Sequence, residues 1–302
     1  MKKLFSLFIF LNVGLLAIAQ NKALGNDYFF IPGDDVTIPP GGKITLRVKQ
    51  MVNDIPTDAF IKNEQWTIDG KDLAAQNPKE GVFTLERLQL DRGVYTAPAA
   101  PPPNNPVIIT ISFQPEGKTE KIILYCYVHI LNYENFFYLK KPNVPEGSLF
   151  ELKESPLASS RKMRETAYYS NDEWVLGIQG FRKSSKEDAA PQLMTMGLSF
   201  VGNATGTYEW SVHGDNKTGL TPPCNTVSVN GLTDSGSPFL YISSDCVAHG
   251  DNHCKLVTLE GSTTITIFDK KNKIIKGYFS GILISPEFEY VTVSGAFSVF
   301  MQ

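Results

Sequence analysis

Hydrophobic and polar residues alternate with a period of two along most of this chain, which is typical of β-strands that bury one face. The alternation is clearest in three segments: 43–49, 122–130 and 291–299. Turn-forming clusters separate such segments, at 39–42, 101–106 and 269–273. No stretch predicts a helix longer than two turns. The pattern therefore predicts an all-β fold.

The composition and the positions of turn-forming residues indicate that this fold has two domains. The 24 glycines and 19 prolines among 302 residues suit a chain of strands and turns. Residues 132–160 break the strand rhythm with several prolines but are rich in aromatic side chains, which a free linker rarely contains. We expect a β-sandwich at 20–131, a packed linker at 132–160, and a second antiparallel β-sandwich or barrel-like domain at 161–302. Gly277, Gly281 and Gly295 fall within predicted strands, where we expect them to permit curvature.

The first 19 residues have the three parts of a secretory signal peptide. Lys2 and Lys3 form a basic head, an apolar run covers 4–19, and the small residues Ala17 and Ala19 precede a cleavage site. The run has 16 residues, whereas a bilayer span needs about 20. We therefore expect export to the periplasm or the medium, with no integral membrane segment after cleavage. The alternative is an N-terminal membrane anchor.

The charge balance disfavours polyanionic partners but is compatible with protein partners and neutral ligands. The chain carries 28 basic and 31 acidic residues, a net charge of −3. Without Lys2 and Lys3 the balance is 26 against 31, or −5. Nucleic acid and anionic membrane surfaces are therefore not expected partners.

One tryptophan and one tyrosine are the expected anchors of the first domain. Trp66 lies on a predicted strand and is large enough to fill the centre of a two-layer sandwich. Tyr95 follows a glycine at a corner, where its ring can be buried while its hydroxyl bonds to backbone. Cys126 is the one cysteine of this half and alternates with Leu124 and Val128, which predicts a small buried hydrophobe.

The order of these features resembles bacterial immunoglobulin-like domains. The motifs that support this resemblance are Gly93-Val94-Tyr95-Thr96-Ala97-Pro98 and Pro106-Val107-Ile108-Ile109, and the strand tryptophan precedes them. The resemblance covers about a third of the chain and implies an immunoglobulin-like sandwich that acts as a spacer, an adhesive module or an accessory domain. The C-terminal half resembles β-rich modules of uncharacterised secreted bacterial proteins, which implies no activity.

The second half contains three cysteines, Cys224, Cys246 and Cys254. In an oxidising compartment cysteines pair where geometry allows. We expect a disulfide between Cys246 and Cys254, which flank a short loop, with Cys224 bonded to either as the alternative. His249 and His253 stand beside these cysteines, so a metal site is a second alternative, although thiols would have to stay reduced. We therefore predict neither a metal nor a cofactor.

A repeated tetrapeptide supplies the candidate binding residues. His213-Gly-Asp215-Asn216 recurs as His249-Gly-Asp251-Asn252. Two tight turns that use the same residues explain the repeat. Paired loops that bind one ligand are the alternative, because loops on rigid scaffolds commonly carry binding. The aspartate pair Asp34-Asp35 is expected to form a solvated turn, because it lacks the further oxygens of a calcium site.

No catalytic constellation emerges from the remaining motifs. An atypical hydrolase would have to use Ser235 with His249 or His213, which do not form a known motif. Tyr168, Tyr169 and Trp174 are candidate platforms for sugar rings, with a core position as the alternative for Trp174. We expect a non-enzymatic binding or adhesion-type module whose partner is a protein or glycan of the cell envelope. A structural or assembly subunit of an envelope complex is the alternative.

Overall fold

A computed structural model describes most of the chain beyond the predicted leader. The described residues are 28–52, 55–86, 89–141, 144, 147–152, 164–170, 173–182, 192–210, 225–232, 238–249, 253–258, 260–285 and 290–301. Apart from one short 3-10 helix at Leu73–Ala75, their regular structure is β-strand. The prediction of an all-β fold is confirmed.

Two five-stranded sheets form a sandwich at the N-terminal end, which we call the front sandwich. The first sheet has the order β1–β3–β8–β7, with β4 attached to β3: β1 (Tyr28–Ile31), β3 (Lys43–Val52), β4 (Ile55–Asp58), β7 (Val82–Glu86) and β8 (Gln89–Thr96). The second has the order β2–β10–β9–β5–β6: β2 (Asp35–Ile38), β5 (Ile61–Ile68), β6 (Lys71–Asp72), β9 (Val107–Pro115) and β10 (Ile122–Ile130). Strand β2 pairs parallel to β10, and the other pairs are antiparallel.

Aromatic side chains fill the space between these two sheets. The Trp66 ring lies 4.7 Å from the Phe83 ring and 5.9 Å from the Phe30 ring, measured between centroids. Tyr95 is fully buried and its hydroxyl donates a hydrogen bond to the Glu80 carbonyl. Cys126 is also fully buried, as predicted, and burial raises the pKa of its thiol. Because every second residue of β3, β9 and β10 enters this core, the period-two pattern is satisfied.

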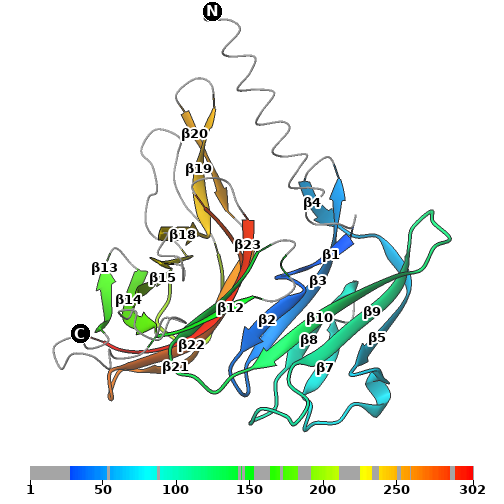
Figure 1. The fold of residues 1–302 in the computed structure, drawn as a ribbon, viewed down its shortest axis with the longest axis horizontal. Helices are drawn as coiled ribbons and strands as arrows, with labels where there is room; N and C mark the ends of the chain where they lie inside the picture. Colours follow the sequence, from blue (N-terminus) through cyan, green and yellow to red (C-terminus); the bar gives the residue numbers. More distant parts are fainter. Residues whose placement is uncertain are drawn as a thin grey trace, which may run out of the picture.

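The second half forms one large antiparallel sheet, which we call the rear sheet. Its order is β12–β11–β23–β22–β18–β17–β15–β14–β13, with β21 pairing β22 and β16 pairing β21. The bounds are β11 (Phe136–Lys140), β12 (Ser148–Glu151), β13 (Arg164–Ser170), β14 (Glu173–Arg182), β15 (Gln192–Phe200), β16 (Gly206–Glu209), β17 (Thr226–Leu232), β18 (Pro238–Ile242), β21 (Gly261–Asp269), β22 (Ile274–Ile284) and β23 (Tyr290–Phe300). The sheet curls into a half-barrel (Figure 1), so its concave face encloses one continuous hydrophobic core. A separate hairpin of β19 (Ser244–His249) and β20 (His253–Thr258) extends away from it (Figure 1).

Residues 132–160 include two strands of this rear sheet. Strand β11 pairs with β23 and with β12, and Phe137 and Phe150 stack with centroids 4.8 Å apart. Both rings belong to the rear core. The chain therefore crosses from the front sandwich into the rear sheet within a few residues of Leu131.

Two strand glycines of the rear sheet, Gly277 and Gly295, lie against aromatic rings. Gly277 pairs with Phe297, and Gly295 pairs with Phe279. A Cβ atom on Gly277 would come within 2.7 Å of the Phe297 ring, and one on Gly295 within 2.6 Å of the Phe279 ring. The absent side chains therefore leave space that the neighbouring rings occupy.

Trp210 uses the same arrangement with two glycines at once. Gly261 and Gly281 are cross-strand partners, and a Cβ on either would come within 2.4 Å of the indole ring. The indole N–H donates a hydrogen bond to Thr263 Oγ1, 3.1 Å away in the interior. The tryptophan is thus held at one edge of the rear core, directly after β16.

Replacing Gly281 by alanine should destabilise the protein, because the new methyl group meets a buried indole and the Gly261 backbone. We expect the free energy of unfolding to fall by about 1–3 kcal/mol, the usual cost of an overpacked core. Gly206→Ala is the matched control, since a Cβ there meets nothing within 4 Å. Denaturant unfolding of both variants measures the difference, and equal midpoints would contradict this packing.

Alkaline pH should unfold the protein through its buried tyrosines. Burial raises the pKa of Tyr95 above its usual value of 10.0, and the nearby Asp69 and Glu80 carboxylates raise it further. A raised folded-state pKa contributes stability that is complete below about pH 10, the pKa of an unfolded phenol, and is lost as the pH rises through the folded-state pKa. We therefore expect the free energy of unfolding to decline above pH 10.

Tyr95→Phe should make that decline shallower, because phenylalanine does not ionise. The exposed Tyr125 provides the control, and Tyr125→Phe should leave the slope unchanged. Urea unfolding between pH 8 and pH 12 measures the slopes. Equal slopes for the wild type and Tyr95→Phe would rule out this linkage.

Candidate functional site

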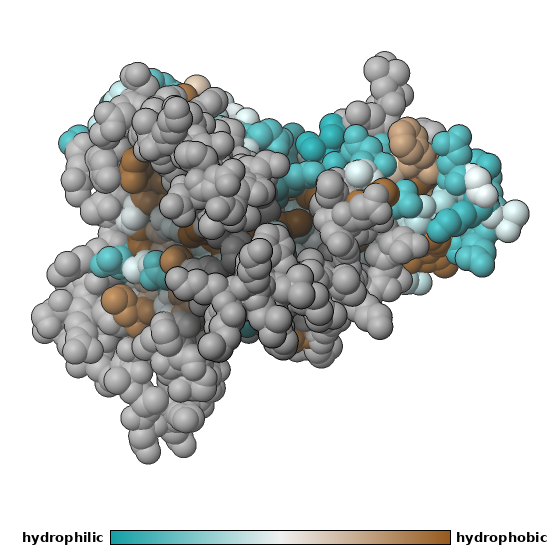
Figure 2. Space-filling view, turned by 90° about the horizontal axis from the view of Figure 1, so that it is seen from above, coloured by the Kyte–Doolittle hydropathy of each residue, from teal (hydrophilic) through white to brown (hydrophobic). Residues whose placement is uncertain are grey.

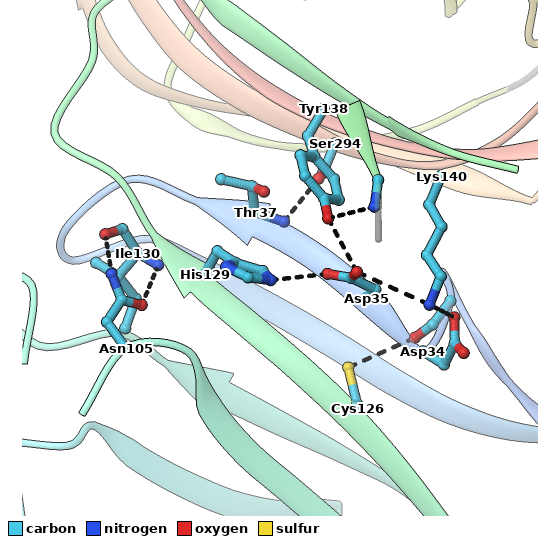
Figure 3. A network of polar contacts seen from close by, with 12 residues as sticks. Asp34, Asp35, Thr37, Asn105, Cys126, His129, Ile130, Tyr138, Lys140 and Ser294 are labelled. Carbon is cyan, nitrogen blue, oxygen red and sulfur yellow. Dashed lines mark hydrogen bonds and ion pairs between the residues drawn. The ribbon is translucent and has the colours of Figure 1, made fainter. Parts of the chain in front are cut away.

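A buried carboxylate joins the front sandwich to the rear sheet. Asp35, at the start of β2, has a side chain that is only 6% exposed. The Tyr138 hydroxyl, on β11, donates a hydrogen bond of 2.9 Å to Asp35 Oδ2 and accepts one from the Gly147 N–H. Lys140, also on β11, places its Nζ 3.8 Å from the same oxygen and 3.1 Å from Asp34 Oδ1 (Figure 3). The expectation that Asp34-Asp35 forms a solvated turn is wrong for Asp35, because the rear sheet covers it.

The front sandwich contributes its own partner to this carboxylate. His129 Nε2, on β10, lies 3.0 Å from Asp35 Oδ1. The ring N–H is not aligned for a hydrogen bond to that oxygen. The contact is therefore electrostatic, and becomes an ion pair when the imidazole is protonated. Side chains from both halves thus converge on one buried group (Figure 3).

Two backbone groups of the front sandwich bond to side chains of the rear sheet. The Thr37 N–H on β2 donates to Ser294 Oγ on β23, at 2.7 Å and fully buried. The Lys43 N–H donates to the Tyr278 hydroxyl on β22, at 2.8 Å. We call these two bonds and the Asp35 contacts the junction. Because a buried polar group is stable only with its partners in place, the junction fixes one orientation of the two halves.

Beside the junction lies a cleft of about 350 Å³ between two sheet faces. One wall is the outer face of β3. Ile44, Leu46 and Val48 point into the front core, so the alternate residues of the strand face outward. The cleft is lined from this strand by Lys43, Thr45 and Arg47.

The opposite wall is the outer face of β16, β21 and β22. The strand registers place Thr207 opposite Thr264, Glu209 opposite Ser262, and Ser262 opposite Ser280. The lining residues of this wall are Thr207, Glu209, Ser262, Thr264 and Ser280, with Glu260 and Trp210 at one end. Thr207 Oγ1 and Thr264 Oγ1 are hydrogen-bonded at 3.0 Å. This wall therefore presents hydroxyl groups, with the carboxylates of Glu209 and Glu260 near Arg47.

Arg47 faces two carboxylates across the cleft without a hydrogen bond to either. Its guanidinium nitrogens lie 3.8 Å from Glu209 Oε1 and 4.0 Å from Glu260 Oε2. Both separations exceed the 2.7–3.2 Å of an N–H···O hydrogen bond. Glu260 Oε2 is buried and has no hydrogen-bond partner among the described residues. The cleft thus contains a donor and an acceptor that face each other with their hydrogen bonds unmade.

The other oxygen of Glu260 is engaged by Lys49. Lys49 Nζ lies 3.1 Å from Glu260 Oε1 and 2.9 Å from Asp58 Oδ1. Burial alone would lower the pKa of this ammonium, but the hydrogen bonds to Asp58 and Glu260 outweigh it, so the pKa is raised. The hydrogen bond from Lys49 in turn lowers the pKa of Asp58. These contacts anchor Glu260 so that its second oxygen is directed toward Arg47.

The structure does not test the residues singled out in the repeated tetrapeptides. His213, Asp215, Asn216, Asp251 and Asn252 lie outside the described residues, as do Cys224 and Ser235. His249 pairs with His253 at the end of the β19–β20 hairpin, and their side chains also lie outside the description. The binding and metal hypotheses for these residues therefore remain predictions.

The same hairpin contains both cysteines of the expected disulfide. Its register places Cys246 opposite Leu256 and Cys254 opposite Ala248, so the two cysteines are not direct cross-strand partners. A bond between them would have to connect diagonal positions, which are usually 7–8 Å apart. The described part of the chain does not test the expected disulfide, which therefore stays a prediction.

Of the three candidate aromatic platforms, Trp174 occupies a core position. It is 9% exposed, and its indole N–H donates to Asn203 Oδ1 at 3.2 Å. The Tyr169 ring is exposed and lies 5.6 Å from the Trp174 ring. The Tyr168 side chain lies outside the description.

Sequence reasoning missed the cleft residues. In segment 43–49 the cationic residues alternate with apolar ones, as on a strand with one side facing solvent. That pattern does not reveal that a second sheet lies opposite. Among the described residues, no His, Cys, Asp and Glu side chains gather in a group of three that could hold a metal ion. None of the helical structure in the described chain is long and apolar enough to cross a membrane.

The fold and the cleft define the class as an all-β protein with a polar cleft between a sandwich and a curled sheet. No protein-family model, curated protein or solved structure matches this chain.

Removing the Tyr138 hydroxyl should destabilise the junction. In Tyr138→Phe the Asp35 Oδ2 atom loses its 2.9 Å hydrogen bond while it stays buried. We expect the free energy of unfolding to fall by about 1–3 kcal/mol, the cost of a buried polar atom that loses its partner. Tyr127→Phe, on the exposed face of β10, is the control. Chemical denaturation that shows no difference between the two variants would contradict the role of Asp35.

Proposed function

We propose that this chain is an exported, non-enzymatic binding module that binds a component of the cell envelope in the cleft. The single observation that carries the proposal is the pair of polar walls held apart by the buried junction. Ligand sites are concave, largely preformed and equipped with a few converging polar groups. The cleft has these properties, because neither wall can move without breaking the bonds of Asp35 and Thr37.

Export is the part of the proposal that rests on the sequence. The basic head, short apolar run and small residues of segment 1–19 support cleavage and release as a periplasmic or extracellular protein. An oxidising compartment would also allow the three cysteines of the rear half to pair. The motif at 93–98 supports an immunoglobulin-like origin of the front sandwich, a fold that commonly serves adhesion.

An assembly subunit is the second candidate, and one observation favours it. Ile123, Tyr125 and Tyr127 form an exposed stripe on the outer face of β10, each 40–49% exposed. Figure 2 shows that the end of the molecule formed by the front sandwich is mainly hydrophilic, with separate hydrophobic patches. Such patches can mark protein contacts. The stripe lies on the other sheet of the sandwich from the cleft.

A retention experiment separates the two functions. Thr45→Tyr fills the cleft with a side chain that suits a strand, and Ile123→Thr/Tyr125→Thr removes two of the three apolar side chains of the stripe. We expect the wild type and the stripe variant to be retained by washed cell-envelope fractions, and Thr45→Tyr to lose at least nine tenths of that retention. Thermal unfolding checks that both variants are folded.

Two outcomes would contradict the binding module. If the stripe variant loses retention while Thr45→Tyr keeps it, the chain is an assembly subunit. If the wild type is not retained, neither function stands.

Export is checked separately, by fractionating cells that express the full chain or a chain without residues 2–19. Equal distribution of the two forms would refute the signal peptide.

A further inference from the structure

We propose that the cleft binds an uncharged saccharide chain, one hydroxyl group of which bridges Arg47 and Glu260. This inference rests on the proposed binding function and names its ligand class. Three properties of the cleft carry it: the balance of its charges, the gap between these two side chains, and the pairing of the strands that form its walls.

The balance of charges disfavours ions of either sign. The ionic side chains that line the cleft are Lys43 and Arg47 on one wall, and Glu209 and Glu260 on the other. They sum to zero. An anion placed against Arg47 would also meet the two carboxylates within about 4 Å of the guanidinium, and a cation placed against them would meet Arg47. A neutral ligand avoids both repulsions.

The gap between Arg47 and Glu260 has the size of one bridging hydroxyl group. A hydroxyl oxygen accepts from a nitrogen at about 2.9 Å and donates to an oxygen at about 2.7 Å. These two lengths close a triangle whose third side is the observed 4.0 Å between Arg47 and Glu260 Oε2. A sugar hydroxyl is both donor and acceptor, so it satisfies the guanidinium and the buried oxygen at the same time. Neither an amide N–H nor a carbonyl can do this alone.

The rest of the lining matches the two kinds of surface on a sugar ring. Thr45, Ser262 and Ser280 supply hydroxyl groups for its edge. Ile31, Pro32 and Val94 supply apolar surface for its C–H faces. The volume of about 350 Å³ is at the lower end of the range for ligand pockets. The cleft therefore accommodates a short stretch of a chain that continues outside it.

The pairing of the wall strands disfavours a peptide ligand. Extended peptides usually bind by adding a strand to a free sheet edge. Three of the wall strands are paired on both sides: β3 is flanked by β1 and β8, β21 by β16 and β22, and β22 by β21 and β23. Among the described strands the short β16 pairs with β21 alone. The backbone groups of the three flanked strands are already used within the sheets, so most of the wall area offers side-chain groups only. Recognition of separate hydroxyl groups suits such walls better than recognition of a backbone.

The test is calorimetric titration of the chain without residues 1–19 with five uncharged hexasaccharides: maltohexaose, cellohexaose, laminarihexaose, mannohexaose and chitohexaose. We expect at least one to bind, and Arg47→Gln and Glu260→Gln each to weaken that binding tenfold or more. Lys71→Gln and Glu134→Gln are the matched controls, because both residues form exposed ion pairs away from the cleft, and they should leave the affinity unchanged.

The double variant Arg47→Gln/Glu260→Gln tests the bridge itself. If one hydroxyl serves both residues, the double variant should bind no more than about threefold weaker than either single variant, because the first substitution already breaks the bridge. Full additivity would overturn the bridge. Should Glu260→Gln unfold through loss of its Lys49 contact, the single variant Arg47→Gln still tests the bridge, because it removes the donor and leaves the contact between Lys49 and Glu260 in place.

Several results would overturn the saccharide assignment. These are no binding of any of the five probes, equal binding by Arg47→Gln and the wild type, or tighter binding of hexagalacturonate or of an extended hexapeptide. If envelope retention is lost in Thr45→Tyr but no saccharide binds, the cleft is a binding site for another ligand class, and only this inference fails. If retention is absent as well, the proposed function fails with it.

Discussion

The structure depends on one buried carboxylate, that of Asp35. Taking a carboxylate out of water costs several kcal/mol unless its partners replace the lost hydration. Those partners come from both halves: His129 belongs to the front sandwich, whereas Tyr138 and Lys140 belong to the first strand of the rear sheet. These partners surround Asp35 in only one arrangement of the two halves. The free-energy cost of burying the carboxylate therefore restrains how the front sandwich and the rear sheet are oriented. The separation between Arg47 and the carboxylates across the cleft therefore depends on a group that does not line it.

The fold class could be predicted from the sequence because it depends on a local property. Alternation in segments such as 122–130 reports one buried face, and no knowledge of the neighbouring strand is needed. The strand glycines were interpreted as points of curvature, and the sheet is indeed curled. A side chain at these positions would, however, also collide with aromatic rings: Phe297 at Gly277, Phe279 at Gly295, and Trp210 at Gly281. These pairs depend on register between strands, which a single sequence does not contain.

The cleft could not be predicted for a related reason. Its walls come from β3 and from β16, β21 and β22, which are separated by more than 150 residues in the chain. Each wall by itself has the polar pattern of a surface exposed to water. The burial of Asp35 could not be predicted for the same reason, because an aspartate pair after Pro32-Gly33 has the local sequence features of a solvated turn. Local rules describe which side of a strand is polar, but they do not reveal whether that side faces solvent or another polar face.

Strand β2 has a consequence for the modular appearance of the chain. Its inner edge is the parallel partner of β10, while the Thr37 N–H on its outer edge is covered by Ser294 from the far end of the sequence. A fragment cut after Leu131 would bare that edge and expose Asp35 at the same time. Unprotected strand edges pair with other chains. Although the sandwich has its own core, it is therefore not an independent building block, and recombining it with foreign domains would require a new cover for this edge.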